Sequence, residues 1–129
     1  MRSVWTNGCF DILHIGHIKL FEYAKSLGDI LVVGIDSDER IKKSKGISRP
    51  INNEQNRQAF LQAIRYIDHT VIFHSDDELC SYIKKFNIDT MVVGDEYKTK
   101  EVIGSEFCKD INFFPKIPNI STSKILNGY

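Results

Sequence analysis

The sequence predicts an α/β fold in which one parallel β-sheet is covered by helices on both faces. Short apolar runs rich in β-branched residues alternate with longer amphipathic segments along the 129 residues. Residues 30–35 are apolar or glycine throughout, as expected of a strand buried on both faces. Because strand and helix alternate, successive strands are expected to be parallel and joined by helices. We therefore predict a single doubly wound sheet, with residues 1–129 forming one domain.

The strands are expected at residues 3–6, 30–35, 70–73, 90–93 and 112–114. In an open parallel sheet, ligands bind beyond the carboxyl ends of the strands. The chemistry of the chain is therefore expected in the segments that follow these five strands.

The helices are predicted from apolar spacing and from capping residues. The first helix is expected to end at Gly28 as its C-cap, and the second to span residues 53–65. Ser75 and Glu78 have the spacing of a capping box, which opens a helix through residue 86, and Ser121 is expected to open a terminal helix. The residues expected to face the core from the first two helices are Ile18, Leu20, Phe21, Ala24 and Leu27, followed by Ala59, Phe60, Ala63 and Ile64.

Composition narrows the class of protein. Seventeen basic residues balance seventeen acidic ones, so no overall field favours binding to nucleic acid or to an anionic membrane. No apolar run approaches the roughly 20 residues that span a bilayer, and residues 1–6 lack the features of a secretory signal. Three widely spaced cysteines (Cys9, Cys80 and Cys108) do not form a disulfide framework. A cytoplasmic protein without nucleic-acid or membrane partners is expected.

The strongest motif is T-N-G-C-F-D-I-L-H-I-G-H at residues 6–17, between the first strand and the first helix. His14 and His17 stand where the helix begins, and a helix N-terminus offers free N–H groups and partial positive charge to a phosphate. Gly16 permits close backbone approach. Both imidazoles can donate hydrogen bonds to phosphate oxygens, which is most effective where charge develops in a transition state. A zinc site is disfavoured, because the pair lacks a convincing third ligand.

This motif resembles the H-x-G-H signature of the cytidylyltransferase-like nucleotidyltransferases. Class I aminoacyl-tRNA synthetases share the signature, but they are much larger, and this chain lacks their basic bias. Residues 33–38, 45–50, 56–57, 66–68, 93–97, 102–106 and 118–123 resemble bacterial heptose-1-phosphate adenylyltransferases. Glycerol-3-phosphate cytidylyltransferases are similar at residues 6–17, 64–68, 94–95 and 120–122. The resemblance implies a Rossmann-like enzyme that transfers a nucleoside monophosphate from a triphosphate to a phosphorylated acceptor and releases pyrophosphate.

The resemblance also implies roles for individual residues. His14 and His17 would contact the triphosphate and stabilise the transition state at the α-phosphorus. Lys45 would bridge the acceptor phosphate and the α-phosphate, with Lys42 and Lys43 as competing candidates. The residues implied for nucleotide binding are Thr6, Asn7, Gly8, Cys9, Phe10, Gly16, Asp95, Ser121 and Thr122.

Acceptor binding is assigned to Asp11, Asp38 and Arg57. Asp11 has two further interpretations, since its carboxylate could orient a histidine or cap the first helix. Cys9 is expected to pack rather than react, because no base partner is visible that would lower its pKa.

Two substrate pairs stay open. ATP with D-glycero-D-manno-heptose 1-phosphate is favoured, and CTP with glycerol 3-phosphate or another polyol phosphate is the alternative. Lys116 stands where the cytidylyltransferases have an arginine, which weakens the cytidine assignment. A nucleotide-binding domain without turnover is the alternative of a different class. Mg²⁺ is expected to accompany the triphosphate, polysaccharide biosynthesis is the expected pathway, and a homodimer is expected by analogy with the relatives.

Overall fold

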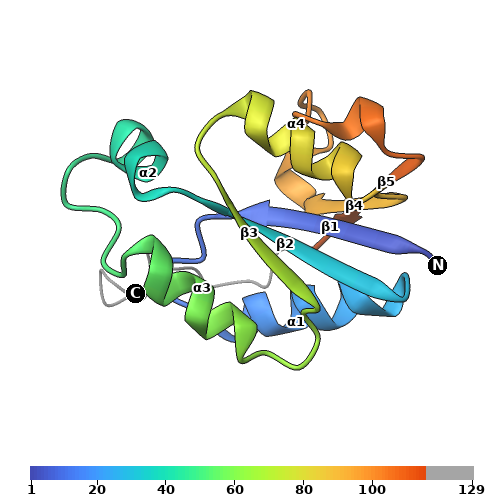
Figure 1. Ribbon diagram of the computed structural model, residues 1–129, viewed down its shortest axis with the longest axis horizontal. Coiled ribbons are helices and arrows are strands. Elements are labelled where there is room, and N and C mark those ends of the chain that lie inside the picture. The colour runs from blue at the N-terminus through green and yellow to red at the C-terminus, as the bar shows by residue number, and fades with distance from the viewer. Residues whose placement is uncertain (116–129) are drawn as a thin grey trace.

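The computed structural model describes residues 1–115, and the helix predicted from Ser121 lies outside them. Strands and helices alternate along this part of the chain (Figure 1). The strands are β1 (Ser3–Gly8), β2 (Ile30–Asp36), β3 (His69–Phe73), β4 (Thr90–Gly94) and β5 (Asp110–Phe114). The helices are α1 (Ile15–Ser26), α2 (Asp38–Lys45), α3 (Glu54–Gln62) and α4 (Asp76–Lys85), and two short 3-10 helices are η1 (Asp95–Tyr97) and η2 (Ser105–Phe107).

The strands form one sheet in the order β3-β2-β1-β4-β5, and every neighbouring pair is parallel. The chain runs outward from β1 through β2 to β3 and then crosses to the other side of β1 to form β4 and β5. The sheet is therefore doubly wound, which confirms the predicted α/β, Rossmann-like class. The order reverses between β1 and β4, and such a switch point opens a crevice at the carboxyl ends of the strands.

Two apolar layers hold the helices against the sheet. On one face, Phe21 of α1 and Leu61 of α3 pack with alternate residues of β1 and β2. On the other face, Ile83 of α4 packs with Trp5 and Phe73. Figure 1 shows α1 and α3 below the sheet and α4 above it, as expected when crossover connections are right-handed.

The buried side of α3 differs from the prediction. Arg57 and Leu61 are the buried residues of this helix, whereas Ala59, Phe60 and Ala63 are exposed, with Phe60 at 48%. Only Ile64 packs against the core as predicted. The helix is rotated because it turns Arg57 inward, and an apolar pattern alone does not reveal a buried arginine.

Gly28 does not act as the C-cap of α1, which is Leu27. A Cβ atom at Gly28 would lie 2.8 Å from the carbonyl oxygen of Arg2, so glycine is required there for close packing against the start of β1. The cap predicted at Ser75 is confirmed, since its hydroxyl accepts a hydrogen bond from the N–H of Glu78 at 3.1 Å. The Glu78 carboxylate reaches one residue further back, to the N–H of His74.

Within residues 1–115, no helix combines the length and the apolar character that a membrane crossing requires.

Candidate active site

A cavity of about 570 Å³ lies at the carboxyl ends of β1, β2 and β4. This is where the fold places the ligand site of a doubly wound sheet. The predicted site residues that line the cavity are Thr6, Asn7, Gly8, Cys9, Phe10, Asp11, His14, Gly16, His17 and Lys45. Asp38, Arg57 and Asp95 do not line it, and Ser121 and Thr122 lie outside the described residues.

His14 and His17 form a capping box at the start of α1. The Nδ1 atom of His14 accepts a hydrogen bond from the N–H of Gly16 at 3.0 Å, and the N–H of His14 donates to Nδ1 of His17 at 3.1 Å. The two rings are stacked with their centroids 3.9 Å apart. A neutral imidazole that accepts through Nδ1 carries its proton on Nε2. Each ring therefore has an Nε2–H group to donate to a ligand.

The protonation state of the pair follows from its surroundings. Burial, followed by the nearby His14 ring, lowers the pKa of His17 to about 4. Burial also lowers the pKa of His14. Both rings are therefore neutral at pH 7, and they act as hydrogen-bond donors that carry no charge of their own. The positive potential at this point comes from the N-terminus of α1.

Phe10 holds the turn that precedes the histidines. Its backbone has φ of +50°, a conformation that is uncommon for residues other than glycine. Its buried ring meets His17 edge-on at 5.5 Å and Phe21 at 5.2 Å. A Cβ atom at Gly8 would lie 3.1 Å from the Phe10 ring, so glycine lets the turn close tightly. Gly8 and Phe10 both line the cavity.

Asp11 anchors the loop between α2 and α3. Its carboxylate accepts hydrogen bonds from the N–H groups of Ile51 and Asn52, both at 2.8 Å, and from Nε of Arg49 at 3.2 Å. Burial raises the pKa of Asp11, but these donors outweigh burial and the pKa lies below its usual value. Neither of the two sequence-based interpretations is correct, because His14 caps α1 and the carboxylate contacts the loop instead of a histidine.

Arg57 is a fully buried arginine behind the wall of the cavity, with 0% of its surface exposed. Its guanidinium donates to the carbonyl oxygens of Asn52, Cys9 and Asp36 at 3.0, 2.8 and 2.7 Å. It also pairs with the carboxylate of Asp38 at 2.7 Å. These four contacts join the turn after β1, the end of β2, the start of α2 and the loop before α3. The structure thus places Arg57 and Asp38 as supports of the site, away from the cavity surface.

Three cationic residues of α2 and of the loop that follows it line the cavity: Arg40, Lys45 and Arg49. Lys45, the last residue of α2, is exposed and makes no ion pair with any residue of the described part of the chain. Of the two competing lysines, neither lines the cavity, and Lys43 pairs with Glu39 at 3.5 Å. Arg49 was not singled out from the sequence, although it lies in the basic segment 45–50. It is held by Asp11 with 15% of its side chain exposed.

The opposite wall follows β4 and carries acidic and aromatic groups. Asp95 pairs with Lys98 at 2.9 Å and does not line the cavity. Its neighbour Glu96 does line the cavity, and its carboxylate folds back over Gly94. Tyr97 and Glu101 also line the cavity. The sequence pattern located the correct segment, but the choice between adjacent carboxylates depends on the turn of η1.

A family model described as cytidylyltransferase-like matches residues 5–128. The chain belongs to the cytidylyltransferase-like family. Bifunctional protein HldE of Campylobacter fetus subsp. fetus is 44% identical over 124 residues, which are 96% of this chain and 27% of that protein. Bifunctional protein HldE of Campylobacter jejuni subsp. doylei is 46% identical over 127 residues, which are 97% of this chain and 27% of that protein. The chain thus spans about a quarter of the length of these relatives.

Solved structures agree with this assignment. The crystal structure of the lipopolysaccharide core biosynthesis protein from Thermoplasma volcanium superposes with a TM-score of 0.70 at 26% identity, covering 91% of this chain and 97% of that one. Pantothenate synthetase from Thermus thermophilus shares the fold, with a TM-score of 0.68 at 11% identity over 97% of this chain and 61% of that one. The family predicted from the H-x-G-H motif is confirmed, and the expectation of a nucleotidyltransferase is confirmed at the level of the family.

In this cytidylyltransferase-like domain, Cys9 is a packed thiol. Burial raises its pKa, and the nearby Asp36 carboxylate raises it further. The thiolate form needed for nucleophilic attack is therefore scarce at neutral pH. Among residues 1–115, no group of three or more His, Cys, Asp or Glu side chains is arranged to hold a metal ion.

Proposed function

We propose that this domain transfers AMP from ATP to D-glycero-D-manno-heptose 1-phosphate and releases pyrophosphate. The observation that carries the proposal is the stacked, neutral histidine pair at the N-terminus of α1, with two Nε2–H donors available to the cavity. The resemblance of residues 45–50 and 93–97 to heptose-1-phosphate adenylyltransferases supports this substrate pair. The likeness to a lipopolysaccharide core biosynthesis protein also favours a sugar phosphate as acceptor.

The proposed reaction is an in-line displacement at the α-phosphorus. An oxygen of the acceptor phosphate forms a bond to this phosphorus, and the bond to the oxygen that bridges to the β-phosphate breaks. The acceptor phosphate is already ionised, so no side chain has to remove a proton. Catalysis then rests on positioning and on donors aimed at the charge that develops. His14 and His17 supply those donors.

Lys45 and Arg49 are proposed to hold the acceptor phosphate. Lys45 lines the cavity and makes no ion pair within residues 1–115, and Arg49 presents a guanidinium that Asp11 keeps in place. Two cations bring two anionic substrates together and reduce their mutual repulsion. The backbone of residues 6–10 and the β4 wall are left for the nucleotide.

Magnesium enters this scheme as part of the Mg–triphosphate substrate. Mg²⁺ keeps several waters and binds substrate phosphates more often than a cage built by protein alone. Adding EDTA should therefore abolish turnover, and adding excess Mg²⁺ should restore it.

The test is pyrophosphate release in the presence of Mg²⁺, with ATP, CTP, GTP and UTP each offered with heptose 1-phosphate and with glycerol 3-phosphate. We expect a signal confined to ATP with heptose 1-phosphate. A signal confined to CTP with glycerol 3-phosphate would replace the proposal with the alternative. Nucleotide binding without turnover on any pair would favour a non-catalytic domain.

The assembly and the location of the protein stay predictions. A homodimer would be contradicted by a monomer mass in light scattering at micromolar concentration. A cytoplasmic location would be contradicted by recovery of the native protein with the membrane fraction.

A further inference from the structure

We infer that Asp36, the last residue of β2, recognises hydroxyl groups of the phosphorylated acceptor and so helps to determine which acceptor reacts. This inference rests on the proposed function, and it concerns a residue that the sequence did not single out. Asp36 lines the cavity with 18% of its side chain exposed.

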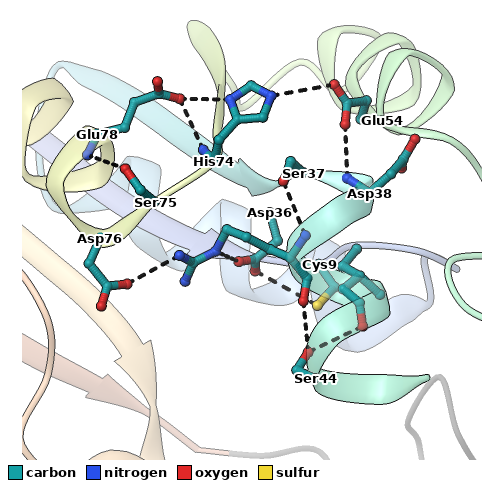
Figure 2. A network of polar contacts seen from close by, with 12 residues as sticks. Cys9, Asp36, Ser37, Asp38, Ser44, Glu54, His74, Ser75, Asp76 and Glu78 are labelled. Atoms are coloured by element: carbon teal, nitrogen blue, oxygen red, sulfur yellow. Dashed lines mark hydrogen bonds and ion pairs between the residues drawn. The ribbon is translucent and has the colours of Figure 1, made fainter. Parts of the chain in front are cut away.

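The Asp36 carboxylate is held in one orientation. Its Oδ1 atom accepts a hydrogen bond from Nε of Arg40 at 2.9 Å. Arg40 is in turn fixed by Asp76 of α4 at 3.2 Å and lies over the Phe73 ring at 5.0 Å. Figure 2 shows the line of contacts from Cys9 through Asp36 to Asp76. A carboxylate fixed in this way loses little conformational freedom when a ligand binds.

The other oxygen of Asp36 retains capacity to accept hydrogen bonds. Oδ2 has one partner within residues 1–115, the Sγ of Cys9 at 3.7 Å. A thiol is a weak donor, whereas an ionised carboxylate accepts strong hydrogen bonds at several positions. A sugar hydroxyl that reaches Oδ2 would therefore add a stronger hydrogen bond without displacing Arg40.

The charges around the cavity indicate which substrate meets Asp36. The cations Lys45 and Arg49 lie at the end of α2 and on the segment after it, and Arg40 also lines the cavity, where it pairs with Oδ1 of Asp36. A triphosphate oxygen placed against Oδ2, the atom that faces Cys9 and not Arg40, would meet like charge, which is unfavourable. An acceptor that combines one phosphate with several hydroxyls matches both the cations Lys45 and Arg49 and the Oδ2 atom of Asp36.

The surroundings of Cys9 and Tyr97 indicate that Asp36 and Lys45 lie in the same region of the cavity. After burial, the carboxylate of Asp36 raises the pKa of the Cys9 thiol and the charge of Lys45 lowers it, so both groups act on the same thiol. Burial raises the pKa of Tyr97, and Glu96, Cys9 and Asp36 raise it further. Cys9, Asp36 and Lys45 also line the same cavity, and Sγ of Cys9 lies 3.7 Å from Oδ2 of Asp36.

The experiment compares Asp36→Asn with Asp76→Asn in the complete chain. We expect Asp36→Asn to raise the KM for heptose 1-phosphate by about 10-fold or more, as for loss of a hydrogen bond to a charged group. The KM for ATP should change by less than about 2-fold, because a hydroxyl contact acts on one substrate only. Asp76→Asn removes the other carboxylate on Arg40 but does not touch the cavity. It should leave both KM values unchanged.

A second measurement needs no variant. Heptose 1-phosphates that each lack one hydroxyl are assayed with the unchanged protein. The analogue that lacks the hydroxyl bound by Asp36 should show a loss of kcat/KM about as large as the loss caused by Asp36→Asn. On Asp36→Asn, that same analogue should react about as well as the full acceptor.

Equal effects of Asp36→Asn and Asp76→Asn would overturn the inference, since Asp36 would then act only through Arg40. An unchanged acceptor KM in Asp36→Asn, with normal turnover, would overturn it while the proposed function stands. Absence of turnover with every sugar phosphate would overturn the proposed function and this inference together.

Discussion

Replacing Arg57 with methionine distinguishes a supporting role for this residue from direct substrate binding. Methionine keeps most of the length of the buried side chain but removes its charge and all of its donors. Three carbonyl oxygens, those of Asn52, Cys9 and Asp36, would lose their contacts with the guanidinium. The Asp38 carboxylate, which is 28% exposed, would lose its ion-pair partner but can be partly rehydrated.

The expected loss of stability is large. Removing one partner of a buried ion pair costs about 3 to 5 kcal/mol. Unpaired buried carbonyls add to this cost, and partial hydration of Asp38 reduces it. We therefore expect the free energy of unfolding to fall by about 3 to 5 kcal/mol. At about 4 °C for each kcal/mol in a domain of this size, Tm should fall by about 12 to 20 °C.

Urea and thermal unfolding followed by circular dichroism measure this loss. Arg65→Met is the matched control, because Arg65 is exposed and its guanidinium bonds only to the hydroxyl of Tyr66 within residues 1–115. The control should lose less than about 0.5 kcal/mol. A loss of less than about 1 kcal/mol in Arg57→Met, together with a raised KM for either substrate, would refute the supporting role and return Arg57 to the ligand-binding surface.

Three further predictions concern the site and the sheet beneath it. The pKa of His17 is about 4 in the folded chain and about 6.5 when unfolded. The unfolded chain therefore binds more protons between these values, and unfolding free energy should rise with pH across this window by up to about 3 kcal/mol. Comparison with His17→Asn checks this, because the slope should become clearly smaller in that variant, where His14 still contributes to it. Gly34→Ala should cost about 1 to 3 kcal/mol in urea unfolding, since its Cβ would lie 2.5 Å from the Trp5 ring; an unchanged midpoint would contradict the tight packing. Asp11→Asn should raise the acceptor KM several-fold by releasing Arg49, and an effect confined to the KM for ATP would contradict that role.

The regular elements of the fold were predictable because their determinants are local. The apolar run of residues 30–35 corresponds to β2, and Ser75 caps α4 as predicted. β1 continues past Thr6 to Gly8, because pairing with β2 extends to Gly8 opposite Ile35. A polar or glycine residue at a strand end gives no local sign of that pairing.

The buried face of α3 and part of the site were not predictable in this way. Arg57 is buried because four groups converge on it, three of them 19 to 48 residues away in the sequence, and sequence spacing does not report that convergence. The histidine pair was predictable from the sequence, because one short turn carries both rings. Asp36 and Arg49 join the cavity only when the ends of β2 and of the following loop meet at the switch point of the sheet.

The most direct test of the central claim is the rate of pyrophosphate release from ATP and heptose 1-phosphate with Mg²⁺, measured for the unchanged protein and for His17→Ala. We expect kcat to fall by about 10² to 10³ in the variant, as when one oxyanion-stabilising donor is removed. Circular dichroism should show that the variant remains folded. An unchanged kcat in folded His17→Ala would contradict the assignment of the stacked histidines as the donors that stabilise the transition state.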